Sequence, residues 1–285
     1  PLYPEIRLAL FPGRKMNRLL DAFAPDAIHC MTEGTLGFAA KRYAKKHHMP
    51  FTTWYHTHFH YYVNMRFSGL LTLVMSIARN FHNASTSTFV STESLKKELE
   101  SHHFKHLTVV PLGVDTEKFK RNLVPKVPQY PKPVFVFFSR LAVEKSPEEF
   151  LDLWLEGTKL VIGDGPDRER LEKKYGIENG GDSTFVGYKT GQELVDYLSA
   201  SDVMVFPSRT ETFGLAALEA MACGVPVAAH NVQGPKDIIS HGIDGYLENN
   251  LADAAVRCLT LDRESCRQKA LQFTWDHTVD AFIKN

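Results

Sequence analysis

Residues 206–226 read FPSRTETFGLAALEAMACGVP, and this stretch decides the fold class. An apolar strand ends at Phe206, a polar loop follows, and a helix is predicted to begin near Gly214. A strand, a loop and a helix in this order form the repeating unit of an α/β domain with a parallel sheet. Because ligands of such sheets bind at the carboxyl ends of the strands, this loop is a candidate site.

The same alternation continues on both sides of the stretch. Short apolar runs predict strands at residues 26–30, 51–55, 84–90, 134–138, 159–163, 184–186, 203–207 and 225–229. Amphipathic runs predict helices at residues 94–99, 148–155, 168–175, 193–199 and 214–223. We therefore expect an α/β protein with two doubly wound, Rossmann-like domains.

A proline-rich segment separates the two predicted domains. Residues 121–133 carry four prolines and show no helical periodicity, which is typical of a linker. We therefore expect a first domain over residues 1–120, a second domain over residues 134–270, and a final segment over residues 271–285.

The loop and helix start of the quoted stretch predict an anion site. Free backbone amides near Phe213, Gly214 and Leu215 point beyond the strand, and the helix dipole favours a negative charge there. Glu211 and Glu219 flank this position, and carboxylates accept hydrogen bonds from sugar hydroxyls. This layout indicates a ligand with hydroxyls on both sides of a phosphate, such as a nucleotide-sugar. Each glutamate alone is as readily a solvated charge, but Glu219 has apolar neighbours, among which an idle charge is costly.

Two further loops support a phosphate ligand. Arg140 and Lys145 follow the first strand of the second domain, where a guanidinium fork and an ammonium can converge on a diphosphate. Gly163 and Gly165 form a tight turn after the next strand. Taken alone, the two cations are as readily surface charges, and such glycine turns are common.

Together these motifs resemble those of retaining glycosyltransferases of the GT-B fold, known as glycosyltransferase family 4 or glycosyl transferases group 1. Glu211 and Glu219 match the Glu-x7-Glu signature of this family. The other matching segments follow in the family's order: 111–115 (PLGVD), 139–141 (SRL) with Lys145, 163–166 (GDGP), 185–187 (FVG) and 223–227 (CGVPV). The resemblance covers nearly the whole chain, which is similar to bacterial mannosyltransferases and sulfoquinovosyl diacylglycerol synthases.

The resemblance implies two Rossmann-like domains facing a cleft, and transfer of a hexose with retention of configuration. It assigns the donor diphosphate to Arg140 and Lys145, and the donor sugar to Glu211. His56 is the equivalent of a family histidine that lies beside the donor sugar. These four residues are the expected catalytic group.

The remaining donor contacts implied by the resemblance come from the second domain. Glu219 binds the ribose, amides at the helix start bind the distal phosphate, and residues 186–188 border the base. The expected donor-binding residues are Gly163, Gly165, Val186, Tyr188, Phe213, Gly214, Leu215 and Glu219.

A histidine-rich segment offers an alternative interpretation. His56, His58 and His60 have a spacing that a metal cluster can use, but no carboxylate accompanies them in the segment. Because the family is usually metal-independent, the resemblance implies no metal and no cofactor beyond the nucleotide-sugar substrate. His58 and His60 are more often structural in such a segment.

The composition excludes several classes of protein. The 33 Lys and Arg residues balance 33 Asp and Glu residues, so no overall charge favours nucleic acid. The longest apolar run, residues 70–78, is too short to span a bilayer. The four cysteines lack metal-site spacing and are interpreted as buried free thiols in a reducing compartment. We therefore expect a cytoplasmic protein.

The acceptor is predicted only as a class, a lipid or a glycan, and the donor as GDP- or UDP-linked. Lys41, Arg42, Lys45 and Lys46 recur at helical spacing. Such a basic face favours either peripheral contact with anionic lipid on the inner face of the membrane or an ordinary solvated surface.

Family members open with a strand and a Gly-rich loop, which nothing before residue 26 resembles. We therefore expect the first domain to be truncated at its N-terminus. Residues 273–276 resemble the start of the family's final helix, which crosses back to the first domain. A nucleotide-sugar-binding fragment without activity, or a GT-B sugar-nucleotide epimerase, is the alternative function.

Overall fold

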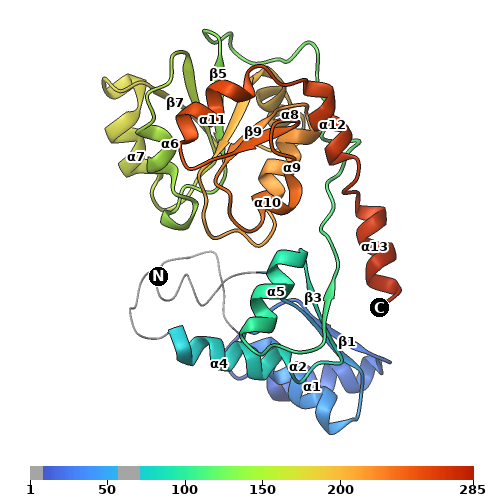
Figure 1. The fold of residues 1–285 in the computed structure, drawn as a ribbon. Helices are drawn as coiled ribbons and strands as arrows, with labels where there is room; N and C mark the ends of the chain where they lie inside the picture. The colour runs from blue at the N-terminus through green and yellow to red at the C-terminus, as the bar shows by residue number, and fades with distance from the viewer. Residues whose placement is uncertain (1–8, 57–70) are drawn as a thin grey trace. The chain divides into compact units, whose positions relative to one another are not determined.

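The computed structural model describes residues 9–56 and 71–285, which form two compact α/β units (Figure 1). The first unit runs to Pro111 and includes Ala281–Asn285, and the second is Leu112–Asp280. The sequence placed the end of the first domain at residue 120. Residues 112–120 cluster with the second unit because Val114 and Phe119 are buried in its core.

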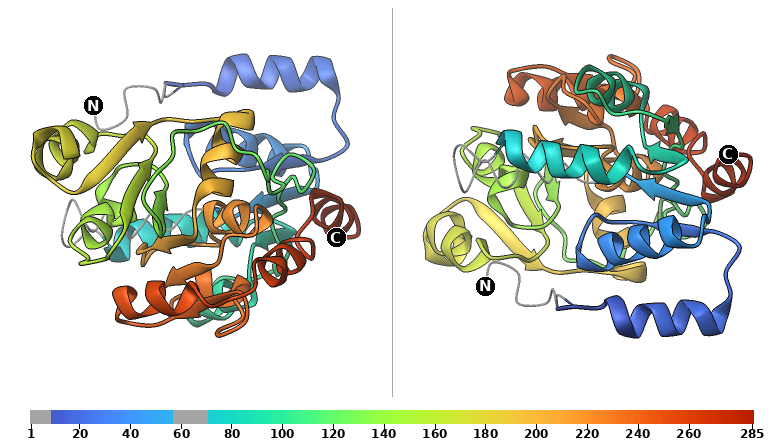
Figure 2. Two further views of the ribbon diagram at one scale, coloured as in Figure 1. Left: turned by 90° about the horizontal axis from the view of Figure 1, so that it is seen from above. Right: turned by 90° about the horizontal axis from the view of Figure 1, so that it is seen from below.

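The first unit contains a four-stranded parallel sheet in the order β1-β2-β3-β4. Its strands are β1 (Ile28–Cys30), β2 (Phe51–Trp54), β3 (Ser87–Val90) and β4 (Leu107–Val109). Its helices are α1 (Gly13–Phe23), α2 (Thr35–Lys46), α4 (Leu71–His82) and α5 (Glu93–Ser101). Helix α1 lies at the outer edge of this unit (Figure 2), where the Tyr43 hydroxyl of α2 donates to Asp21 at 2.8 Å.

The second unit contains a six-stranded parallel sheet in the order β10-β9-β8-β5-β6-β7. Its strands are β5 (Val134–Phe138), β6 (Thr158–Ile162), β7 (Ser183–Gly187), β8 (Val203–Phe206), β9 (Val227–Ala229) and β10 (Gly245–Leu247). Its α-helices are α6 (Pro147–Leu151), α7 (Arg168–Tyr175), α8 (Gly191–Ala200), α9 (Leu215–Ala222), α10 (Pro235–Ile238), α11 (Leu251–Cys258) and α12 (Arg263–Ala270). Helix α13 (Trp275–Ile283) contains residues of both units, and two short 3₁₀ turns are η1 (Val143–Lys145) and η2 (Ile177–Asn179).

The sheet of the second unit is buried on both faces. In β5, Val134 and Val136 face one core, which also contains side chains of α8 and α9. Phe135 and Phe137 face the other core, which contains side chains of α6, α7 and α11. Successive side chains of a strand alternate between faces, so a strand buried on both sides reads as one continuous apolar run. Two parallel α/β units confirm the predicted fold class.

Helix α6 is shorter than the predicted helix at residues 148–155. It ends at Leu151, and Trp154 is 87% exposed. The buried Lys159 ammonium donates to the carbonyl oxygens of Leu151 and Leu153 at 2.5 and 3.1 Å. A side chain from β6 thus satisfies carbonyls that a longer helix would pair internally. The sequence patterns also did not predict α1, α4, α10, α11, α12 or β10.

No helix within residues 9–56 and 71–285 is long and apolar enough to cross a membrane. All four cysteines are free and buried, as the sequence predicted. Burial raises the pKa of the Cys30 thiol to about 11 and that of Cys266 to about 12, so these thiols stay protonated and unreactive.

Candidate functional site

The strand order of the second unit reverses between β5 and β8. Strands β5, β6 and β7 extend one way from this point, and β8, β9 and β10 extend the other way. The loops that follow β5 and β8 therefore leave the sheet side by side at its carboxyl edge. Such a switch point is where open α/β sheets bind ligands. The loop after β5 contains Arg140 and Lys145, and the loop after β8 contains Glu211.

An ion pair joins the two loops. The Lys145 ammonium lies 2.5 Å from Oε1 of Glu211, and the two side chains are 22% and 10% exposed. The hydroxyls of Ser208 and Thr210 both donate to the carbonyl oxygen of Glu144, each at 3.3 Å. These contacts fix the 3₁₀ turn that contains Lys145 against the loop that contains Glu211. The structure thus brings together two of the predicted catalytic residues.

The loop of Arg140 rests on the glycine turn after β6. Gly163 has φ +144°, and a Cβ built there would lie 2.0 Å from the carbonyl oxygen of Ser139. A Cβ on Gly165 would lie 2.3 Å from the carbonyl oxygen of Leu141. Only glycine permits this approach, so both glycines position the backbone on either side of Arg140, whose side chain is half-buried.

Helix α9 begins at the same edge without a side-chain cap. Its N-cap, Gly214, has φ +105° and, as a glycine, has no side chain that could cap the first amides of the helix. Leu215 is 36% exposed, whereas the Phe213 side chain is 2% exposed and packs against Phe273 with ring centroids 5.8 Å apart. Phe213 can therefore serve a ligand only through its backbone. Uncapped amides at a helix start attract an anion.

Glu219 lies in the second turn of α9 and is half-buried. Burial raises the pKa of its carboxyl to about 7, and the nearby charge of Lys118 lowers it in part. Glu219 has no hydrogen bond or ion pair to another side chain within the described part of the chain. A carboxyl that titrates near neutrality without a structural partner is typical of a ligand-binding group.

Glu219→Gln is expected to increase the free energy of unfolding at pH 8 by about 1–2 kcal/mol. The pKa rises from 4.5 in the unfolded chain to about 7 in the fold. The stability that this carboxyl contributes is therefore complete below pH 4.5 and is lost as the pH rises through 7. Urea unfolding at pH 5 and pH 8, with the exposed Glu169→Gln as control, measures the difference. An equal effect of Glu219→Gln at both pH values would contradict this prediction.

The predicted base-binding residues lie at the end of β7 and directly after it. Val186 packs partly against the core, and Tyr188 is 71% exposed. The amide of Gly163 donates to the carbonyl oxygen of Gly187 at 2.9 Å, so the two segments adjoin. The base-binding role of these residues stays a prediction.

The structure contains a second polar network at this edge, which the sequence analysis did not predict. Oε1 of Glu149 lies 2.7 Å from Nε2 of the fully buried His230 and 2.9 Å from Nη2 of Arg209. The other ring nitrogen of His230 lies 3.2 Å from the carbonyl oxygen of Glu248. This network ties α6 to the loops after β8 and β9. No sequence signal predicts it, because its members lie as many as 81 positions apart.

His56 follows β2 in the first unit. Its ring stacks on that of Trp54, with centroids 4.8 Å apart and an interplanar angle of 15°. Burial, and then the charge of His29, lowers the pKa of His56 to about 4, so the imidazole is neutral at pH 7. His58 and His60 lie outside the described residues, so the alternative of a metal cluster stays untested. Within residues 9–56 and 71–285, no three His, Cys, Asp or Glu side chains form a group suited to a metal.

Two protein-family models match the chain. The model "Glycosyltransferase Family 4" matches residues 1–118, and "Glycosyl transferases group 1" matches residues 119–263. Sulfoquinovosyl transferase SQD2 of Arabidopsis thaliana is 32% identical over 96% of this chain. The chain spans 59% of the length of SQD2. A GDP-mannose-dependent alpha-mannosyltransferase of Mycobacterium tuberculosis is 27% identical over 95% of this chain and 75% of its own length.

Solved structures share the fold. Sucrose-phosphate synthase of Thermosynechococcus elongatus matches with a TM-score of 0.79 and 20% identity, over 95% of this chain and 76% of that one. Anabaena Alr3699/HepE in complex with UDP-glucose matches with a TM-score of 0.75 and 17% identity, over 95% of this chain and 80% of that one. These likenesses confirm the predicted GT-B fold class. The matched models and the identity to SQD2 show that this chain belongs to the glycosyl transferases group 1 family.

Proposed function

We propose that the chain belongs to a retaining glycosyltransferase, which moves a hexose from a GDP- or UDP-linked sugar to a lipid or glycan acceptor. The observation that carries this proposal is the Lys145–Glu211 ion pair at the switch point of the sheet. It places a cation and a hydroxyl-binding carboxylate at the edge where α9 begins without a cap. A sugar diphosphate has the matching order of hydroxyls and negative charge.

The proposed reaction needs little covalent chemistry from the protein. The bond between sugar C1 and the diphosphate oxygen breaks, and its electron pair leaves on the nucleotide. The acceptor hydroxyl bonds to C1 on the same face, and its proton passes to the departing phosphate oxygen. Arg140, Lys145 and the first amides of α9 stabilise the charge that develops on the leaving group. Because these groups supply the positive charge, the proposal includes neither a metal ion nor a cofactor.

The other site residues have roles in the same scheme. Glu211 accepts hydrogen bonds from the donor sugar and Glu219 from the ribose, for which its carboxyl must be ionised. Neutral His56 can donate or accept a hydrogen bond beside the reacting sugar. The names of the relatives support the substrate classes, since SQD2 is a sulfoquinovosyl transferase and the mycobacterial enzyme is GDP-mannose-dependent.

We also propose that the protein is cytoplasmic and contacts the inner face of a membrane peripherally. Four cations of α2 support this contact: Lys41, Arg42, Lys45 and Lys46. A basic helix face is attracted to anionic headgroups within about one Debye length. Such a contact would bring a lipid acceptor to the enzyme.

Nucleotide-sugar binding is expected to raise the melting temperature of the 285-residue chain by about 5 °C at a ligand concentration near 100 times Kd. A thermal-shift screen with UDP-glucose and GDP-mannose measures this, because a ligand that binds only the folded state stabilises it. Lys145→Ala is expected to abolish the shift, whereas the exposed Lys173→Ala keeps it.

No shift with any UDP- or GDP-sugar would contradict the proposal. The alternatives differ in their products when the full-length protein is assayed with an acceptor. A transferase forms a glycosylated acceptor, an epimerase releases free nucleotide without needing one, and a binding fragment gives no product.

A further inference from the structure

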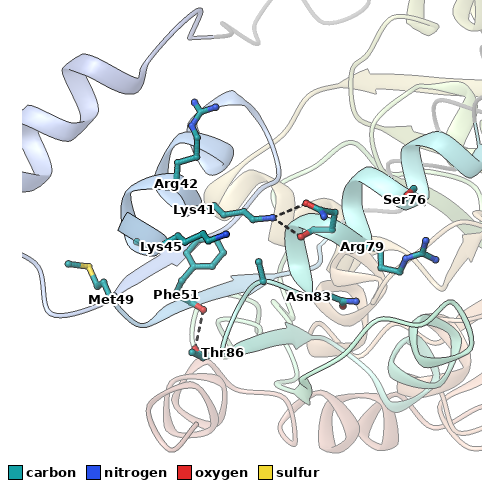
Figure 3. A pocket seen from close by; sticks show the side chains of 12 residues that line it. Lys41, Arg42, Lys45, Met49, Phe51, Ser76, Arg79, Asn83 and Thr86 are labelled. Carbon is teal, nitrogen blue, oxygen red and sulfur yellow. Dashed lines mark hydrogen bonds between the residues drawn. The ribbon is translucent and has the colours of Figure 1, made fainter. Parts of the chain in front are cut away.

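A basic groove lies in the first unit at the edge opposite to His56. It has a volume of about 850 Å³ and lies between α2 and α4 (Figure 3). Its floor includes Phe51, the first residue of β2, and Thr86, which directly precedes β3. The Thr86 hydroxyl donates to the Phe51 carbonyl oxygen at 3.0 Å. The groove is thus at the amino ends of the strands, whereas His56 follows the carboxyl end of β2.

The groove has a strong excess of positive charge. Its lining includes Lys41, Arg42, Lys45 and Arg79, and none of the described residues that line it is Asp or Glu. None of these four cations forms an ion pair with a carboxylate within residues 9–56 and 71–285. Burial, and then the charge of Lys45, lowers the pKa of Lys41. Cations held together without a counter-charge repel one another, so an anion placed among them is stabilised.

The cations of the groove keep free hydrogen-bond donors. The Lys41 ammonium donates to the carbonyl and side-chain oxygens of Asn80 at 2.6 and 3.0 Å, which fixes it and leaves one N–H. Arg79 donates one hydrogen bond from Nη1 to the His102 carbonyl oxygen at 3.2 Å. Its other guanidinium hydrogens remain available as donors. Figure 3 shows Lys41 and Lys45 extending from α2 toward α4, whereas Arg42 points away and Arg79 extends from α4 in the direction away from the two lysines.

We infer that this groove, through the summed positive charge of its lining, is a binding site for a phosphate group with two negative charges. Bidentate guanidinium contacts and ammonium charges suit a phosphate, and the absence of carboxylates in the lining favours full ionisation. The phosphate can belong to a soluble phosphate ester or to a lipid headgroup such as phosphatidic acid. This site does not depend on the proposed donor site, which lies in the other unit, but it shares Lys41, Arg42 and Lys45 with the proposed membrane contact.

The test measures binding of inorganic pyrophosphate by calorimetry at low ionic strength. Because pyrophosphate also suits the proposed donor site, three double variants are compared with the wild type. Lys45→Gln with Arg79→Gln removes the groove cations, and Arg140→Gln with Lys145→Gln removes the donor-site cations. The matched control, Lys97→Gln with Lys105→Gln, removes two charges of the same unit that do not line the groove.

We expect the groove variant to weaken one pyrophosphate-binding event by about tenfold or more, since it removes two of the cations that attract the anion. The control should change pyrophosphate binding less than twofold. The donor-site variant should still bind pyrophosphate in the groove. A second arm measures flotation with phosphatidylcholine vesicles with and without phosphatidic acid. If the groove variant loses only the vesicle binding, the phosphate is that of a lipid. If it loses only pyrophosphate binding, the ligand is soluble.

Two results would overturn the inference. One is a groove variant that binds both pyrophosphate and acidic vesicles as the wild type does. The other is an equal loss in the groove variant and the Lys97/Lys105 control, which would show an effect of net charge alone. Failure of the proposed donor site would appear separately, as an Arg140/Lys145 variant with unchanged pyrophosphate binding.

Discussion

Lys145→Ala is expected to lower the turnover of the full-length protein by about 100-fold or more. The ammonium is 22% exposed and lies 2.5 Å from Glu211, so it acts in a partly desolvated position where its charge is weakly screened. Without it, the departing diphosphate loses one of its two side-chain cations, and the Glu211 carboxylate repels it without compensation. Arg140→Ala is expected to have an effect of similar size.

Initial rates with a saturating nucleotide-sugar donor and acceptor measure this effect. Lys173→Ala, which removes an exposed lysine of α7, is the matched control and should change turnover less than twofold. Because removal of Lys145 also leaves Glu211 without this ion pair, the melting temperature of each variant must be recorded. A folded Lys145→Ala variant with nearly normal turnover would refute the role of leaving-group stabilisation.

Gly163→Ala is expected to destabilise the second unit by about 3–5 kcal/mol. The new Cβ would lie 2.0 Å from the Ser139 carbonyl oxygen, and the atom that must move is backbone rather than a flexible side chain. The backbone at φ +144° adds strain for any residue with a Cβ. The shift of Ser139 also displaces Arg140, so turnover should fall with stability.

The variant Gly180→Ala measures the backbone strain of a positive φ in the absence of a steric clash. Gly180 also has a positive φ, +85°, but nothing lies within 4 Å of a Cβ built there. Gly180→Ala should therefore lower the free energy of unfolding by only about 1–2 kcal/mol, the ordinary penalty of a left-handed residue with a Cβ. Denaturant unfolding of both variants measures the difference. Equal destabilisation would show that the contact with Ser139 contributes nothing.

The sequence alone determined most of the strands and much of the local site. The apolar run of 134–138 and the amphipathic run of 168–175 match β5 and α7, because burial periodicity is a local property. The spacing of Glu211 and Glu219 likewise fixes both residues on one strand–loop–helix unit. The family resemblance rested on such local motifs, and the matched models confirm it.

Only the tertiary structure decided how these units combine. Lys145 and Glu211 pair across 66 positions because β5 and β8 are neighbours in the sheet, and strand order depends on packing of the whole unit. The same holds for His230 and Glu149, which no periodicity connects. Burial of the Phe213 ring and the raised pKa of Glu219 also depend on distant neighbours. A sequence encodes which side chains seek burial, but the long-range contacts of the packed fold determine which of them meet.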